Sequence, residues 1–307
     1  MVTNSVVLHG TDERDLLALP AIVLGFRPRE SCVVLALRQR RVQFCSRMDL
    51  DWYTTDFAEV AVQLLNACDE ASPCQVVLLG YGQDRREVAA SLRELIDVFE
   101  GDVMRVLSTD GEQLWCDEEV WGDGPGEPYC WLDSAVVAEA VYQGIVIVDS
   151  RAEAVAEVMP PPGADDGALA QLLAQERAAV QGMSLTEAMR QFDSLVAAPT
   201  GLRPEQAGRL AVLLETPQLV SEVMSRLTRA DAKSLRVRLL QARAQCDARA
   251  AINVLALLAV TCWLTGYGAQ QSACMEQLDR LQPQHPVLEM LVRLHHLGIP
   301  PQRWDDD

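Results

Sequence analysis

Two short apolar runs near the start of the chain have the pattern of β-strands. Residues 31–37 and 42–48 are rich in β-branched and apolar side chains, and residues 38–41 form a polar connection of hairpin length. Residues 12–24 form an apolar helix, which the Gly25–Pro28 step ends because proline disfavours helical angles in the preceding residue. A lone hairpin is barely stable, so we expect later elements to complete a sheet.

The chain then alternates between helix and strand. We expect a helix from Thr54 or Thr55 to Cys68, a strand over 76–79, a helix over 84–99 and a strand over 103–107. Strand, helix and strand in that order predict a βαβ unit and therefore a partly parallel sheet. Further expected elements are an opening strand at 5–8, a return strand at 112–116, a helix at 135–142, an edge strand at 145–148 and then a helix capped by Asp149. The helix from Thr54 or Thr55 is expected to bury one apolar face: Phe57, Val60, Ala61, Leu64 and Leu65.

The second half has only helical patterns. The run Pro160–Gly163 cannot be helical and marks a linker. Helix starts follow it, with capping boxes at Ser184 and Thr228 and first-turn prolines at Pro204 and Pro217. We therefore predict an acidic α/β domain with a mixed sheet at 1–160 and an all-helical domain at 161–307.

Residues 250–297 resemble one tetratricopeptide-like helix pair, with small residues that allow close helix contact: Ala256, Ala259 and Gly266, then Ala273. Stacking repeats usually needs about three such units. An ordinary helical bundle explains the pattern equally well, and both alternatives remain open.

Charge is distributed unevenly along the chain. The net charge is −18, with 12 basic against 28 acidic residues in 1–160 and 14 against 16 afterwards. This acidic half disfavours nucleic acid as a partner. No apolar run reaches the ~20 residues of a membrane span, and no leader opens the chain, so we expect a cytoplasmic protein. The nine cysteines are then expected to be reduced.

The turn after the 76–79 strand is the first candidate site. Ligands gather at the carboxyl ends of parallel strands, and Gly80, Tyr81, Gly82 and Asp84 occupy that position. The glycines would let an anion approach the backbone at a helix start. The turn lacks a third glycine and a phosphate-loop lysine, so a plain strand-to-helix turn is the competing interpretation.

Residues 109–130 form an acidic loop with five carboxylates around three aromatic rings, including Trp121. A metal or a basic peptide would suit such a cluster. The spacing fits neither a calcium loop nor a zinc site, so we expect no metal and treat the loop as solvated.

Four basic residues, Arg229, Lys233, Arg236 and Arg243, recur on one face of a predicted helix. A solvated face, contact with the acidic half, or an anionic partner would each explain this stripe. Nucleic-acid binding through it is disfavoured by the net charge. The chain shows no catalytic motif and no cofactor motif, and His9 is the single histidine of the first half.

Four segments resemble an actinobacterial family known as domain of unknown function 4192: DLLALPAIVLGFRPRESCVVLAL (15–37), FCSRMDL (44–50), VVLLGYG (76–82) and LLAVTCWLTGYGAQQSACMEQLDRLQPQHP (257–286). The block from Leu16 to Leu35 is the most specific part. Family members commonly carry cysteines where this chain has acids between Cys116 and Pro128, which argues further against a metal. The resemblance implies an architecture and no mechanism.

These observations lead to two functional hypotheses. The first is a non-enzymatic protein-interaction or scaffold module with a protein partner or a homo-oligomeric state. The alternative is a small-molecule or nucleotide-binding protein, or a hydrolase, that uses the Gly80–Gly82 turn with the acidic loop as a lid. The sequence identifies no catalytic residue.

Overall fold

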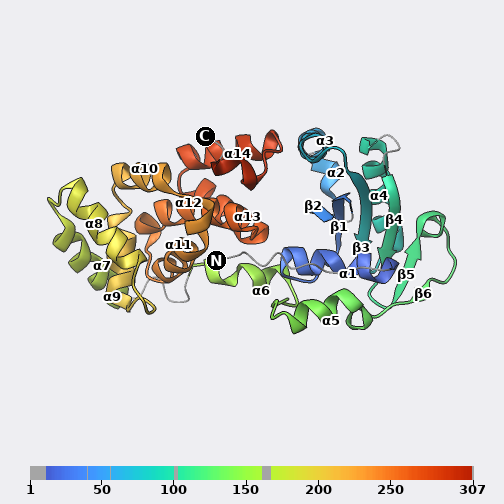
Figure 1. Ribbon diagram of the computed structural model, residues 1–307, viewed down its shortest axis with the longest axis horizontal. Helices are drawn as coiled ribbons and strands as arrows, with labels where there is room; N and C mark the ends of the chain where they lie inside the picture. The colour runs from blue at the N-terminus through green and yellow to red at the C-terminus, as the bar shows by residue number, and fades with distance from the viewer. Residues whose placement is uncertain (1–11, 40, 56, 100–102, 161–166, 306–307) are drawn as a thin grey trace. The chain divides into compact units, whose positions relative to one another are not determined.

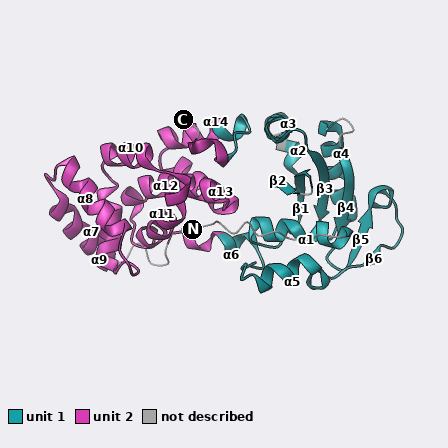
Figure 2. Cartoon of the chain, viewed as in Figure 1, with its two compact units in different colours: residues 1–154, 294–300 teal, residues 155–293, 301–307 magenta. Residues whose placement is uncertain are grey.

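A computed structural model describes residues 12–39, 41–55, 57–99, 103–160 and 167–305 (Figure 1). It confirms the predicted fold class, a mixed six-stranded sheet with helices followed by a helical region. Contacts divide the chain into a sheet unit, residues 1–154 with 294–300, and a helical unit, residues 155–293 with 301–307 (Figure 2). The boundary predicted at residue 160 stays a prediction, because the linker at 161–166 lies outside the described residues. Residues 5–8 and His9 lie outside them as well.

The sheet has the strand order β2-β1-β3-β4-β5-β6. Only β3 and β4 pair in parallel among the described strands, and the connecting helix confirms the predicted βαβ unit. The first hairpin is confirmed, with pairing that extends to Arg38 and Arg41, so its loop is shorter than expected. The strands are β1 Ser31–Arg38, β2 Arg41–Asp49, β3 Gln75–Tyr81, β4 Val103–Thr109, β5 Gln113–Cys116 and β6 Glu127–Pro128.

Helices cover both faces of the sheet (Figure 1). Side chains alternate along a strand, so Cys32 and Val34 of β1 face the core beneath α2, α3 and α4, whereas Val33 and Leu35 face the core beneath α1. Burial on both faces explains why β1 is a continuous apolar run. The helices and turns of this unit are α1 Glu13–Leu24, α2 Trp52–Thr55, α3 Phe57–Ala71, α4 Arg85–Phe99, η1 Asp117–Trp121, η2 Trp131–Asp133, α5 Ala135–Tyr142 and α6 Arg151–Val155.

Three local expectations for the sheet unit are wrong. The apolar face predicted for α3 is buried only in part: Leu64 is buried and Val60 packs against the core, whereas Phe57 and Leu65 are exposed. Residues 145–148 add no strand and make one isolated bridge, between Phe26 and Val148. Ser150, rather than Asp149, accepts the hydrogen bond from the Glu153 amide at the start of α6.

The helical unit begins with η3 (Ala156–Val158), and its predicted helix starts are confirmed. Ser184 and Thr228 accept hydrogen bonds from amides of the first turn, and Pro204 and Pro217 are the first residues of their helices. The choice between a repeat-like pair and a bundle stays a prediction. The elements are α7 Gly167–Val180, α8 Leu185–Val196, α9 Pro204–Leu213, α10 Pro217–Arg226, α11 Arg229–Arg243, α12 Ala248–Thr265, α13 Gly268–Leu281, α14 Pro286–His296 and η4 Pro301–Asp305.

Helix α12 is the central apolar helix of this unit. It is long and apolar enough to cross a membrane, which the shorter apolar run in the sequence did not suggest. However, 72% of it is buried inside the structure, as in the core helix of a globular domain. All nine cysteines lie in the described residues, and none of them forms a disulfide bond there.

The basic stripe on α11 is only half exposed. Its four residues do share a helix face, but Arg236 and Arg243 are 7% and 4% exposed. Arg236 pairs with Gln270 and stacks on Tyr267, and Arg243 donates to Gln277 and to the Val158 carbonyl. Helix α13 therefore covers the C-terminal half of the stripe. A solvated face, one of the three explanations for the stripe, is therefore wrong for Arg236 and Arg243.

His285, between α13 and α14, predicts a pH dependence of stability. Its Nδ1 accepts from the Val287 amide at 3.2 Å and its Nε2 lies 3.0 Å from the Asn253 amide oxygen, so the neutral ring fits its site. Burial lowers the pKa of His285 below the ~6.5 of an unfolded chain. The unfolded state therefore takes up the proton first as pH falls, and stability present above pH ~6.5 is lost below it.

We expect His285→Gln to reduce the dependence of the free energy of unfolding on pH between about 7 and about 5.5. Burial also lowers the pKa of His295, which adds a contribution of the same sign. Urea unfolding at several pH values should therefore show a smaller slope in His285→Gln than in the native protein, and a still smaller slope when His295→Gln is added. An unchanged slope in both variants contradicts the prediction.

Candidate functional site

A cavity of ≈ 260 Å³ lies at the carboxyl ends of the parallel strands β3 and β4. We call it the sheet cleft. Open α/β sheets bind their ligands at this position. The cleft is lined by residues from five segments that the fold brings together: Leu17, Ala18 and Ala21; 27–30; 81–83; 109–111; Tyr129 and Trp131.

The segment between α1 and β1 forms one wall of the sheet cleft. Gly25 ends α1 with a φ of 78°, a left-handed conformation that favours glycine. The Arg27 amide then donates to the Val148 carbonyl at 3.1 Å, and Pro28 is buried. Glu30 has a φ of 41°, and its carboxylate accepts from the Gln83 amide at 3.2 Å. These contacts fix the backbone from which Arg27 and Arg29 project.

The β4–β5 turn forms the opposite wall. Asp110 accepts from the amides of Glu112 and Gln113 at 2.8 and 2.7 Å, and Thr109 donates to the Gln113 carbonyl at 2.7 Å. Gly111 adopts a φ of 99°, a left-handed conformation that favours glycine, in the turn between the two strands. The Asp110 carboxylate is thus occupied in holding its own loop.

Aromatic rings line the cleft. Tyr81 is buried and donates to the Leu17 carbonyl at 2.8 Å, which ties β3 to α1. Tyr129 is 8% exposed, and the Arg27 guanidinium carbon lies 4.7 Å from the centre of the Trp131 ring. Burial raises the pKa of both tyrosines, so both remain protonated at neutral pH.

The four residues predicted at the glycine turn do not all meet at the cleft. Tyr81 and Gly82 line it, whereas Gly80 and Tyr81 belong to β3 rather than to a turn. Gly80 is a packing residue, because a Cβ there would lie 2.4 Å from Val88 Cγ1. Asp84 caps α4 by accepting from the Arg86 amide at 2.9 Å. The cleft thus uses two of the four predicted residues.

The acidic loop is more folded than expected. Trp115, Val120 and Tyr129 are buried, and Asp117 pairs with Arg105. Arg85 stacks on the Trp115 ring at 4.0 Å and donates to the carbonyls at positions 119, 122 and 124, which holds the loop to the start of α4. Trp121 is half-buried beside Arg93. Within the described ranges, no three His, Cys, Asp or Glu side chains form a potential metal site.

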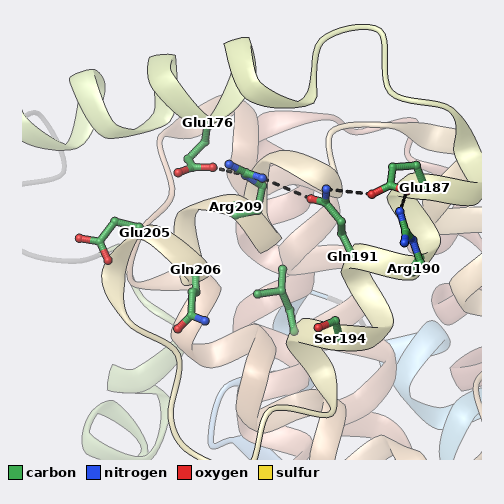
Figure 3. A pocket seen from close by; sticks show the side chains of 9 residues that line it. Glu176, Glu187, Arg190, Gln191, Ser194, Glu205, Gln206 and Arg209 are labelled. Carbon is green, nitrogen blue, oxygen red and sulfur yellow. Dashed lines mark hydrogen bonds and ion pairs between the residues drawn. The ribbon is translucent and has the colours of Figure 1, made fainter.

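A second hollow, the helical groove, has a volume of ≈ 470 Å³ and lies among α7, α8 and α9 (Figure 3). Its polar side chains bind one another in a row, as the dashed lines in Figure 3 show. Arg209 pairs with Glu176 and donates to Gln191 at 3.2 Å, Gln191 donates to Glu187 at 3.2 Å, and Glu187 pairs with Arg190. Both cations of the groove are already neutralised.

Sequence reasoning missed most of the cleft. It found Tyr81 and Gly82 from the strand–helix pattern, but not Arg27, Arg29, Tyr129 or Trp131. One available signal was the GFRPRE stretch at residues 25–30, whose two arginines follow directly on a helix end and precede a buried strand. Nothing in a single sequence connects that stretch with Tyr129.

The fold is a mixed α/β sheet unit followed by a helical region. The chain belongs to the family described as domain of unknown function (DUF4192), whose model matches residues 14–302. The match confirms the family resemblance and includes both units. The actinobacterial placement stays a prediction. No curated protein and no solved structure matches the chain.

Proposed function

We propose that this protein binds a small molecule in the sheet cleft. The observation that carries the proposal is the position of the cleft at the carboxyl ends of β3 and β4, the only parallel pair among the described strands. Its volume of ≈ 260 Å³ is just below the range typical of drug-sized ligands, which suits a compact metabolite.

The chemistry of the lining supports binding. Ala18, Ala21 and Pro28 provide apolar surface beside the aromatic rings, and the cationic groups are those of Arg27 and Arg29. An apolar wall with a few polar groups is the usual composition of a ligand site. The two carboxylates of the lining accept from backbone amides and the Thr109 hydroxyl donates to the Gln113 carbonyl, so we propose binding rather than nucleophilic catalysis.

Ala21→Leu tests the proposal by filling the cleft from α1. Ala21 is buried and lines the cavity, so the longer side chain takes ligand volume. A ligand at 100 times its Kd stabilises the native protein by about 2.7 kcal/mol. In a thermal-shift screen of metabolites on the full chain, we expect a positive shift that Ala21→Leu abolishes.

The matched control is Ala138→Leu, an exposed alanine on α5 outside the cleft, which should retain the shift. A ligand-induced shift that persists in Ala21→Leu would place the ligand elsewhere and contradict the proposal. Absence of any shift across the screen would also count against it.

The other expectations from sequence stay predictions. These are the role as a protein-interaction or scaffold module, a protein partner or homo-oligomer, and the cytoplasmic location. The helical groove adds no support for the interaction role, because its two arginines pair with acids of the groove itself. Sedimentation of the full chain over a range of concentrations would test self-association.

A further inference from the structure

Arg27 is two-thirds buried, yet its guanidinium makes no hydrogen bond with any described residue. Its side chain is 32% exposed and stacks over Trp131. The one charged partner in the described residues is Asp149, 3.8 Å away and 80% exposed. That separation is too long for a hydrogen bond, and such an exposed pair contributes little. The N–H donors of Arg27 are therefore available at the wall of the sheet cleft.

Tyr129 supplies a second available donor in the same cleft. Among the described residues its hydroxyl has no hydrogen-bond partner, in contrast to Tyr81, which donates to Leu17. In the described ranges, three buried side-chain polar atoms lack a hydrogen-bond partner. They belong to Ser31, Arg47 and Arg236. The Tyr129 hydroxyl is not one of these atoms, so it keeps contact with solvent, and Tyr129 lines the cavity.

The carboxylates of the lining do not neutralise these donors. Glu30 is engaged by the Gln83 amide, and Asp110 by the amides of its own turn. No described ion pair joins either acid to Arg27 or Arg29. A guanidinium and a hydroxyl donor that line the same cavity suit the two oxygens of a carboxylate or the oxygens of a phosphate.

We propose that the sheet cleft recognises a compact organic anion whose carboxylate or phosphate group binds Arg27 and Tyr129 while its apolar body lies against Ala21 and Trp131. This inference rests on the proposed function of the cleft and names its ligand class. The two acids on the rim disfavour a highly charged ligand, because like charges repel. A single anionic group on an apolar body therefore fits the lining best.

The test uses the full chain and four probes in ligand-observed NMR: benzoate, phenyl phosphate, neutral benzamide and inorganic phosphate. We expect benzoate or phenyl phosphate to bind more tightly than benzamide and inorganic phosphate. Arg27→Gln should weaken the anionic probe about tenfold or more, which corresponds to about 1.4 kcal/mol, and leave benzamide unchanged. Tyr129→Phe should weaken it less.

Arg86→Gln is the charge-matched control, because Arg86 is exposed on α4 and does not line the cleft. Preference for benzoate over phenyl phosphate, or the reverse, identifies the oxyanion. Equal binding of neutral and anionic probes, no binding of either organic anion, or an unchanged preference in Arg27→Gln would each overturn the inference. Binding of benzamide that is lost in Ala21→Leu would still support the cleft as a ligand site, so the two proposals can fail separately.

Discussion

Asp15→Ala is expected to lower the free energy of unfolding of the sheet unit by about 3 kcal/mol. Asp15 is 2% exposed, and its carboxylate accepts from the Ser134 hydroxyl at 2.8 Å and from the Val136 amide at 3.3 Å. A side chain of α1 thereby caps the first turn of α5. Alanine would leave the hydroxyl and the amide buried without this acceptor, and each such group costs about 1–3 kcal/mol.

Urea unfolding, fitted with separate transitions for the two units, would measure this loss. Asp12→Ala is the matched control, because Asp12 caps α1 itself and is exposed, so about 1 kcal/mol is expected. Asp15→Asn keeps one acceptor and should fall between the two. A cost of Asp15→Ala no larger than that of Asp12→Ala would contradict the importance of the contact between α1 and α5.

Gly80→Ala is expected to destabilise the sheet unit by about 2–3 kcal/mol through overpacking. The added Cβ would lie 2.4 Å from Val88 Cγ1 and 2.9 Å from Leu92 Cδ1, both on α4. Either the helix or the strand must then shift. The absence of a side chain at Gly80 thus allows α4 to pack closely on β3.

A double variant makes this explanation testable. Val88→Ala removes the clashing methyl group, so Gly80→Ala with Val88→Ala should cost at least about 1 kcal/mol less than the sum of the single changes. Gly124→Ala is the control, because nothing lies within 4 Å of the added Cβ, and it should change stability by less than about 0.5 kcal/mol. Additive costs in urea unfolding would show that Val88 is not the obstacle.

The cleft and the helical groove differ in what they leave for a ligand. In the groove, Arg209 and Arg190 are paired with Glu176 and Glu187. In the cleft, Arg27 has only a distant, exposed partner among the described residues, and the acids bind backbone amides. Unsatisfied donors beside an apolar wall favour the smaller hollow as the functional one, although the groove has the larger volume.

Local patterns predicted individual elements well because they depend on neighbours in sequence. The Ser184 and Thr228 caps each involve an amide three residues away, and the β3–α4–β4 order follows from period and turn residues. The α3 face failed because an amphipathic spacing shows which side chains share a face and not how much of that face another element covers.

The sequence alone determined strands β1 to β5, four helix starts of the helical unit and the change from a sheet to a helical region, since each is set by contacts over a few residues. The tertiary structure decided which of those positions serve the site. Arg236 and Arg243 became interior residues through glutamines 34 positions later. Arg27, Tyr81 and Tyr129 meet only because the sheet order places their segments side by side. The placement of distant residues around one cavity depends on packing between distant elements, which local periodicity does not encode.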